Sequence, residues 1–125
     1  MEVFEEIFRL LKKDGELIIS VDSFSHFDKK QREIHRKNFD VVKYFEKDEL
    51  HELLQKIGFK EIQIKPIFKS KFAEKWFTRV MNNPSEYFGS FKRLYSFILY
   101  YQITYHENKV KQNDHGIFLI VKCKK

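Results

Sequence analysis

The sequence predicts an α/β fold, in which helices alternate with the strands of a small sheet. Two short, nearly continuous apolar runs, at residues 17–21 and 117–121, are rich in β-branched residues and read as buried strands. Between them, apolar residues recur at intervals of three and four, as in amphipathic helices. A strand followed by a helix and a second strand suits a βαβ unit, so we expect parallel strand pairing.

The elements are expected in a defined order. Helix 1–13 ends at Asp14-Gly15, where Gly15 can take the left-handed conformation, and Pro66 ends the second strand. The first strand should be buried on both faces because its apolar run is continuous. The expected elements are helix 1–13, strand 16–22, a polar helix 28–38, an extended piece 39–45, helix 47–57, strand 59–67, helix 71–82, a helix restarting at Asn83-Pro84 and running to about 101, a polar connection 107–116 and strand 117–123. Residues 1–125 would then form a single domain or half-domain, with a helical insert at about 70–105.

Composition excludes several classes of protein. Among the 125 residues, 42% are hydrophobic and 17% aromatic, which excludes a disordered chain. The single cysteine, Cys123, excludes a disulfide framework and is expected to be a buried, inert thiol. The net charge of +6 could serve nucleic-acid binding, but lysines and arginines are mixed with acidic residues, so we expect a solvated surface and no nucleic-acid partner. With no secretory signal and no membrane-length apolar run, a cytoplasmic protein without a membrane partner is expected.

The segments FRLLKKDGELIIS (residues 8–20) and YFEKDELHELLQKIGF (residues 44–59) together resemble class I S-adenosylmethionine-dependent methyltransferases. Residues 8–20, FRLLKKDGELIIS, are similar to the family's RvLKPGGxLvis segment and depart from it at Lys13 and Asp14. Residues 44–59, YFEKDELHELLQKIGF, are similar to yftxeELxxLLxxaGF and depart from it at Glu46 and Ile57. The resemblance covers nearly the whole chain but only the second half of the family fold.

The resemblance implies a partial Rossmann-like methyltransferase sheet. Strands 16–22, 59–67 and 117–123 would be the family's fifth, sixth and seventh, with the seventh inserted antiparallel between the other two. Residues 22–44 and the helical insert would lie on the substrate side, since ligands of open α/β sheets bind outside the carboxyl ends of strands.

The cofactor half of the family fold has no counterpart in the sequence. The family's Gly-rich cofactor turn is missing, because Gly15, Gly58, Gly89 and Gly116 are isolated. S-adenosylmethionine therefore belongs to the full family fold, and we expect no cofactor-binding residue and no cofactor binding in this chain alone. The implied partner is a missing N-terminal half or a partner chain.

Candidate site residues follow the first strand and lie in the insert. Asp22 and Ser23 could contact substrate, and His26 or His35 could act as a general base near neutral pH. A polar loop that leaves a buried strand, or a solvated helix face in the case of His35, is the simpler explanation of these residues. Trp76 and Tyr95 belong to a stripe of aromatic residues that could line a substrate pocket, form a dimer face or simply pack in the core. The other histidines are scattered, so no metal site is expected.

The leading hypothesis is the C-terminal, substrate-side portion of a methyltransferase acting on a small molecule and inactive without its N-terminal half. The alternative is a non-enzymatic α/β interaction module that pairs or dimerises through an exposed strand edge. A basic nucleic-acid binder is a third possibility. Strand 16–22 would lack its neighbour in the isolated chain, so a homo-oligomer is expected.

Overall fold

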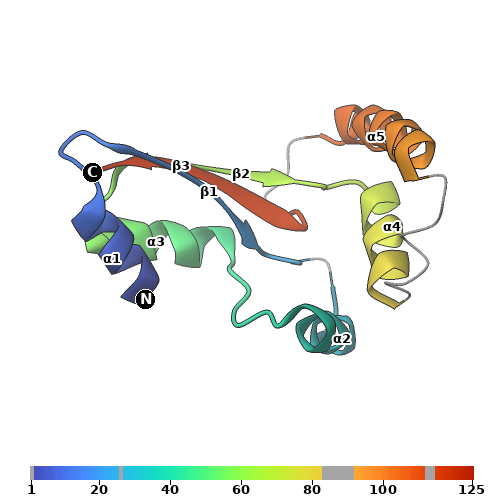
Figure 1. Ribbon diagram of the computed structural model, residues 1–125, viewed down its shortest axis with the longest axis horizontal. Helices are drawn as coiled ribbons and strands as arrows, with labels where there is room; N and C mark the ends of the chain where they lie inside the picture. The colour runs from blue at the N-terminus through green and yellow to red at the C-terminus, as the bar shows by residue number, and fades with distance from the viewer. Residues whose placement is uncertain (1, 26, 83–91, 112–114) are drawn as a thin grey trace.

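The computed structural model describes residues 2–25, 27–82, 92–111 and 115–125, and its class is α/β (Figure 1). Its elements are α1 (Glu2–Leu10), β1 (Glu16–Asp22), α2 (Lys29–Phe39), α3 (Lys47–Ile57), β2 (Lys60–Ile67), α4 (Lys71–Asn82), α5 (Lys92–Lys109) and β3 (Phe118–Lys124). The expected restart at Asn83-Pro84 lies outside the described residues.

The three strands form one sheet in the order β1-β3-β2, and β3 is antiparallel to both neighbours. The expected placement of the last strand, antiparallel between the first two, is confirmed. The expectation of parallel pairing is wrong, since β1 and β2 run in the same direction but β3 separates them. Burial explains the order, because Leu119, Val121 and Cys123 are fully buried and the central strand offers them the most cover.

The main core lies between one face of the sheet and the helices α1 and α3 (Figure 1). Leu50 and Leu54 of α3 are fully buried against the sheet, and Phe4 of α1 is nearly so. The Phe8 and Phe59 rings meet edge to face with centroids 4.9 Å apart. Gly58 ends α3 at φ 113°, a left-handed conformation that suits glycine.

The opposite face of the sheet is open along β1, contrary to the expectation that this strand is buried on both faces. Ile18 is 62% exposed, whereas Leu17 is buried. Two ion pairs lie on the open face. Lys122 Nζ is 2.8 Å from Glu16 Oε1, and Lys124 Nζ is 2.7 Å from Glu61 Oε2. The apolar run indicated a second covering layer, but none of the described helices lies over Ile18.

Several element boundaries differ from the expectations. Helix α1 ends at Leu10, and Asp14, at φ 61°, takes the left-handed conformation expected for Gly15. Strand β2 continues through Pro66, which pairs with Leu119. Proline is tolerated there because β2 is an edge strand. Gly116 lies so close to β2 that a Cβ atom on it would be 2.5 Å from the Ile67 oxygen.

Helix α5 extends to Lys109, well past the expected end near residue 101. Glu107, expected in a polar connection, explains the extension. Its carboxylate accepts hydrogen bonds from the backbone N–H groups of Lys69 (2.8 Å) and Ser70 (2.7 Å), just before α4 begins. The last turn of α5 is thereby tied to the start of α4.

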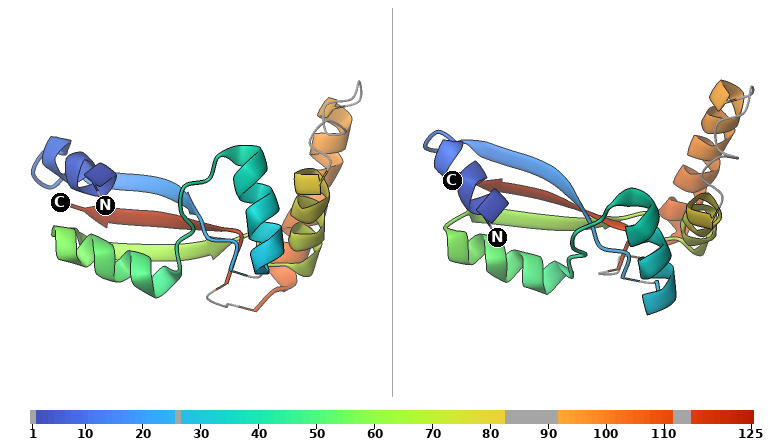
Figure 2. Two further views of the ribbon diagram at one scale, coloured as in Figure 1. Left: turned by 90° about the horizontal axis from the view of Figure 1, so that it is seen from below. Right: turned by 60° about the horizontal axis from the view of Figure 1, so that its bottom comes forward.

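A second, aromatic core forms around Phe24 where α2 and α4 meet the strand ends. Figure 2 shows α2, α4 and α5 gathered toward the end of the sheet that is opposite the chain termini. Asn38 Nδ2 of α2 donates to the Met81 carbonyl oxygen at the end of α4 (2.9 Å). The helical insert is therefore anchored beside the carboxyl end of β1.

Candidate functional site

The candidate site lies at the carboxyl end of β1, which ends at Asp22. The N–H groups of Ser23 and Phe24 both donate to the Ile117 carbonyl oxygen, at 3.0 and 2.9 Å. The Phe45 N–H donates to the Asp22 carbonyl oxygen at 2.9 Å. These bonds hold the end of β1 against the start of β3 and the segment that leads into α3.

His35 reaches this place from α2. Asp28 caps α2, accepting a hydrogen bond from the Gln31 N–H while the Gln31 side chain accepts from the Asp28 N–H, and this capping box sets where the helix begins. His35 is 8% exposed, and its ring lies near the rings of Phe24 (centroids 4.1 Å apart) and Phe39 (4.8 Å). The alternative of a solvated helix face is therefore wrong for His35.

Tyr44 fixes the protonation of the His35 ring. The Tyr44 hydroxyl donates its proton to the Arg32 carbonyl oxygen at 3.0 Å, and His35 Nδ1 lies 2.9 Å from the same hydroxyl oxygen. A hydroxyl that donates its single proton to Arg32 can only accept from His35, and in that arrangement Nδ1 carries the hydrogen. The neutral ring then keeps a lone pair on Nε2, as a general base requires.

Burial sets the electrostatics of the cluster. It lowers the pKa of His35 below the ordinary value of 6.5, and the negative charge of Asp22 opposes this effect. It also raises the pKa of Asp22, which His35 partly offsets. Desolvation is the main cause of the lowered pKa of His35, and its basic neighbours in the sequence are not among the causes. Burial therefore favours the neutral forms of both groups, while the charge of each one favours the charged form of the other.

Two residues of the cluster, Tyr44 and Arg32, were not singled out from the sequence. Arg32 Nε donates to the Phe24 carbonyl oxygen at 3.1 Å, and its guanidinium carbon lies 5.6 Å from the centre of the Tyr44 ring. Phe24 has a φ of 48°, uncommon for a bulky residue. The only sequence signal for Tyr44 was its place at the start of the second family-like segment.

The other predicted site residues are dispersed. Ser23 is buried at the site, and its backbone N–H is bonded to Ile117. Trp76 packs edge to face on Phe77, which belongs to the aromatic core. Tyr95 lies on α5 and is 48% exposed, so it does not line the site with Asp22. His26 lies outside the described residues.

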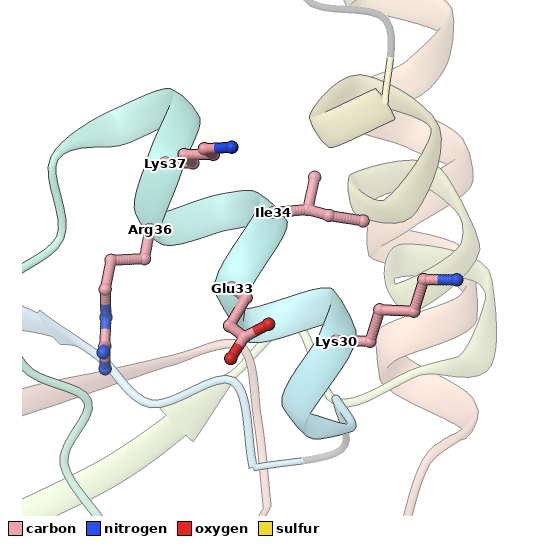
Figure 3. A pocket seen from close by; sticks show the side chains of 5 residues that line it. All are labelled: Lys30, Glu33, Ile34, Arg36 and Lys37. Carbon is pink, nitrogen blue, oxygen red and sulfur yellow. The ribbon is translucent and has the colours of Figure 1, made fainter.

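A basic groove of about 400 Å³ runs along α2 on the surface (Figure 3). It is lined by Lys30, Glu33, Ile34, Arg36 and Lys37. Figure 3 shows Lys30 and Ile34 directed toward α4, while Glu33 and Arg36 are directed away from it. The lining carries three cationic side chains and one carboxylate.

Cys123 is fully buried and burial raises the pKa of its thiol, which confirms the expectation of a buried cysteine. Across the described ranges, no three His, Cys, Asp or Glu side chains are placed to hold a metal ion. No helix in the described part of the chain is long and apolar enough to cross a membrane.

Replacing Tyr44 with phenylalanine should change the tautomer of His35. Without the hydroxyl acceptor, Nδ1–H loses its partner, and the hydrogen is free to move to Nε2. Nitrogen-15 NMR of the histidine rings reports the two tautomers directly. Tyr105→Phe, at an exposed tyrosine on α5, is the matched control. Identical His35 signals in the wild type and Tyr44→Phe would contradict the assignment.

Stability should decline as the pH falls below neutrality. The unfolded chain protonates His35 near 6.5 and the folded chain only at lower pH, so the free energy of unfolding drops from about pH 6.5 down to the folded-state pKa. Asp22 contributes to the pH dependence of stability with the opposite sign. Its folded-state pKa is raised, so its protonation stabilises the fold. That gain in stability comes only at more acidic pH, near the pKa of Asp22. Urea unfolding from pH 7 to pH 5 should show the decline. It should be shallower in His35→Gln than in His51→Gln, and equal slopes would refute the assignment.

Comparison with known proteins shows the fold. No protein-family model and no curated protein matches the sequence. One similar solved structure is an S-adenosylmethionine-dependent methyltransferase from Thermotoga maritima, described as a possible histamine N-methyltransferase. The similarity has a TM-score of 0.50 and 19% sequence identity, and it covers 98% of this chain and 46% of that one. Phosphoethanolamine N-methyltransferase 2 of Haemonchus contortus, solved with S-adenosyl-L-methionine, is similar with a TM-score of 0.55 and 15% identity over 99% of this chain and 29% of that one.

The chain has a partial methyltransferase-like fold. It spans less than half the length of both neighbours. At these identities the likeness concerns the arrangement of helices and strands, and the chemistry of the site has to be argued from its own residues.

Proposed function

We propose that this chain is the C-terminal, substrate-side portion of a class I methyltransferase that acts on a small molecule. The observation that carries the proposal is the buried His35–Tyr44 pair, which interacts electrostatically with Asp22 at the carboxyl end of β1, the place where open α/β sheets bind ligands. The likeness to solved methyltransferases over nearly the whole chain supports it.

The chain's own chemical role is proton transfer. His35 Nε2 accepts the proton that the acceptor's hydroxyl or amine loses as it becomes methylated. Tyr44 keeps Nδ1 protonated, and the negative charge of Asp22 stabilises the imidazolium that forms. Because His35 is kept neutral by burial, it is available as a base at neutral pH.

The residues of this chain do not fit the cofactor. A Gly-rich turn at a helix N-terminus is what brings a backbone close to such a ligand, and the glycines in the sequence are isolated. We therefore assign the cofactor site to a complementary half, and we expect the chain to be inactive without it. The open outer edge of β1 is where a strand of that half would pair.

The acceptor is a small molecule with an anionic group. The groove along α2 has a volume of about 400 Å³, within the range of small-ligand pockets, and it presents Lys30, Arg36 and Lys37. Arg36 also lies over the Tyr44 ring, with its guanidinium carbon 5.6 Å from the ring centre. The groove therefore adjoins the residue that orients His35.

Calorimetry with S-adenosylmethionine tests the proposal. The isolated chain should not bind it, and a chimera of this chain with the part of the Thermotoga maritima methyltransferase that it does not match should bind it. That unmatched part alone is the control. Tight binding to the isolated chain, or a folded chimera without binding, would contradict the proposal.

The exposed edge of β1 also supports the alternative, a non-enzymatic module that pairs with a partner strand. A methyl-transfer assay on the chimera distinguishes the methyltransferase portion from the non-enzymatic module. The module predicts that the folded chimera transfers no methyl group to any acceptor and that His35→Gln leaves partner binding unchanged.

A further inference from the structure

We propose that α5 is a self-association surface through which two copies of this chain dimerise. Seven large apolar or aromatic side chains of α5 are 47% to 65% exposed. They are Leu94, Tyr95, Phe97, Ile98, Tyr100, Tyr101 and Tyr105. Exposed apolar patches of this size on a soluble protein mark sites of interaction.

Helix α5 carries two apolar faces. One face packs on the rest of the molecule, where Leu99 is buried and the His106 ring stacks on Phe72 of α4 with centroids 4.6 Å apart. The other face is a stripe at helical spacing, made by Leu94, Phe97, Ile98, Tyr101 and Tyr105, which we call the α5 stripe. A helix needs only one apolar face to join its own fold, so the α5 stripe is left for a second helix.

The stripe lacks charge. Residues 94–105 contain no Asp, Glu, Lys or Arg. Glu107, the nearest acidic residue, is turned toward α4 and accepts from the N–H groups of Lys69 and Ser70. The absence of charge along three turns of an exposed helix is typical of the core of a protein interface.

The exposed area of the α5 stripe is more than half of what each side of a stable dimer needs. A large side chain offers about 200 Å² for burial, so the five residues of the α5 stripe, roughly half exposed, leave on the order of 500 Å². A standard interface buries about 800 Å² on each partner. The α5 surface therefore supplies most of one side of such an interface.

The stripe is complementary to itself. When two copies of α5 lie antiparallel with Ile98 of one opposite Tyr101 of the other, Leu94 falls opposite Tyr105 as well. Both of these pairs place an aliphatic side chain against an aromatic one, and Phe97 falls opposite Gln102. A two-fold dimer requires this kind of self-complementary patch.

The surface is remote from the edge of β1. In both views of Figure 2, α5 lies beyond the end of the sheet that is opposite α1. Dimerisation through the α5 stripe therefore leaves the edge of β1 open for a complementary half.

Sedimentation equilibrium on the full 125-residue chain tests the dimer. At concentrations up to about 100 μM, above the micromolar limit expected for a standard-sized interface, the wild type should be a dimer. Ile98→Glu and Tyr101→Glu should each raise the dissociation constant about tenfold or more, because they place a charge at the centre of the stripe. Both sites are exposed, so circular dichroism should show an unchanged fold.

Two matched controls separate this surface from others. Ser96→Glu, exposed on α5 but outside the stripe, and Ile18→Lys, exposed on β1, should leave the dimer intact. A monomeric wild type would overturn the proposal, as would a dimer that Ile18→Lys dissociates and Ile98→Glu does not. Flotation of the chain with phosphatidylcholine–phosphatidylglycerol vesicles, lost in Ile98→Glu, would assign the stripe to a membrane surface and would also overturn it.

Discussion

Replacing His35 with glutamine is expected to lower kcat of the completed methyltransferase by about 10²- to 10⁴-fold, the usual contribution of a general base. The glutamine amide can donate a hydrogen bond but cannot take up a proton at the position of Nε2. The measurement is the transfer of a radiolabelled methyl group to the acceptor by the chimera with the cofactor-binding half.

The matched control is His51→Gln, at an exposed histidine on α3 that should leave kcat unchanged. The activity of the wild-type chimera should also decline at acidic pH, as His35 becomes protonated, because only the neutral ring accepts a proton. Since burial lowers the pKa of His35, the decline should begin below 6.5. Full activity in a folded His35→Gln chimera would remove His35 from the chemistry.

Truncating Leu54 to alanine is expected to cost about 2–5 kcal/mol of the free energy of unfolding, the usual cost of a cavity at a buried leucine. Leu54 is fully buried where α3 packs on the sheet, among Leu50, Leu119 and Val121. That cost is a large fraction of the roughly 5–15 kcal/mol that stabilises a typical domain.

The control is Leu10→Ala, at a leucine that is 66% exposed on α1, where a change within about 0.5 kcal/mol is expected. Chemical denaturation followed by circular dichroism compares the two variants. Equal losses in both would mean that the core between α3 and the sheet does not hold the molecule together.

The sequence predicted those helices and strands whose bounds are set by residues within or next to the element itself. The bounds of β1, α3 and α4 agree with the sequence, since an apolar run, an amphipathic stripe and a helix stop at Asn82 are all local features. The place of β3 between the other strands came from the family resemblance and not from periodicity. The end of α5 was not predicted, because Glu107 stabilises it by accepting hydrogen bonds from the N–H groups of Lys69 and Ser70, which lie far away in the sequence.

The candidate site was predicted only in part. Asp22 and His35 were named because of their residue types and their place after a strand. Their environment could not be inferred, because the His35–Tyr44 bond joins residues nine apart that share no helix. The solvent exposure of apolar side chains could not be predicted from the sequence either. Ile18 in β1 and the aromatic residues of α5 follow the same apolar patterns as buried residues.

Hydrogen exchange at β1 tests the central claim most directly, which is that the outer edge of this strand receives a strand from a cofactor-binding half. The N–H groups of β1 that do not bond to β3 should exchange freely in the isolated chain and become protected in the chimera. The outward N–H groups of β2, the other edge of the sheet, serve as the internal control and should exchange alike in both. Unchanged exchange at β1 in a folded chimera would contradict the account.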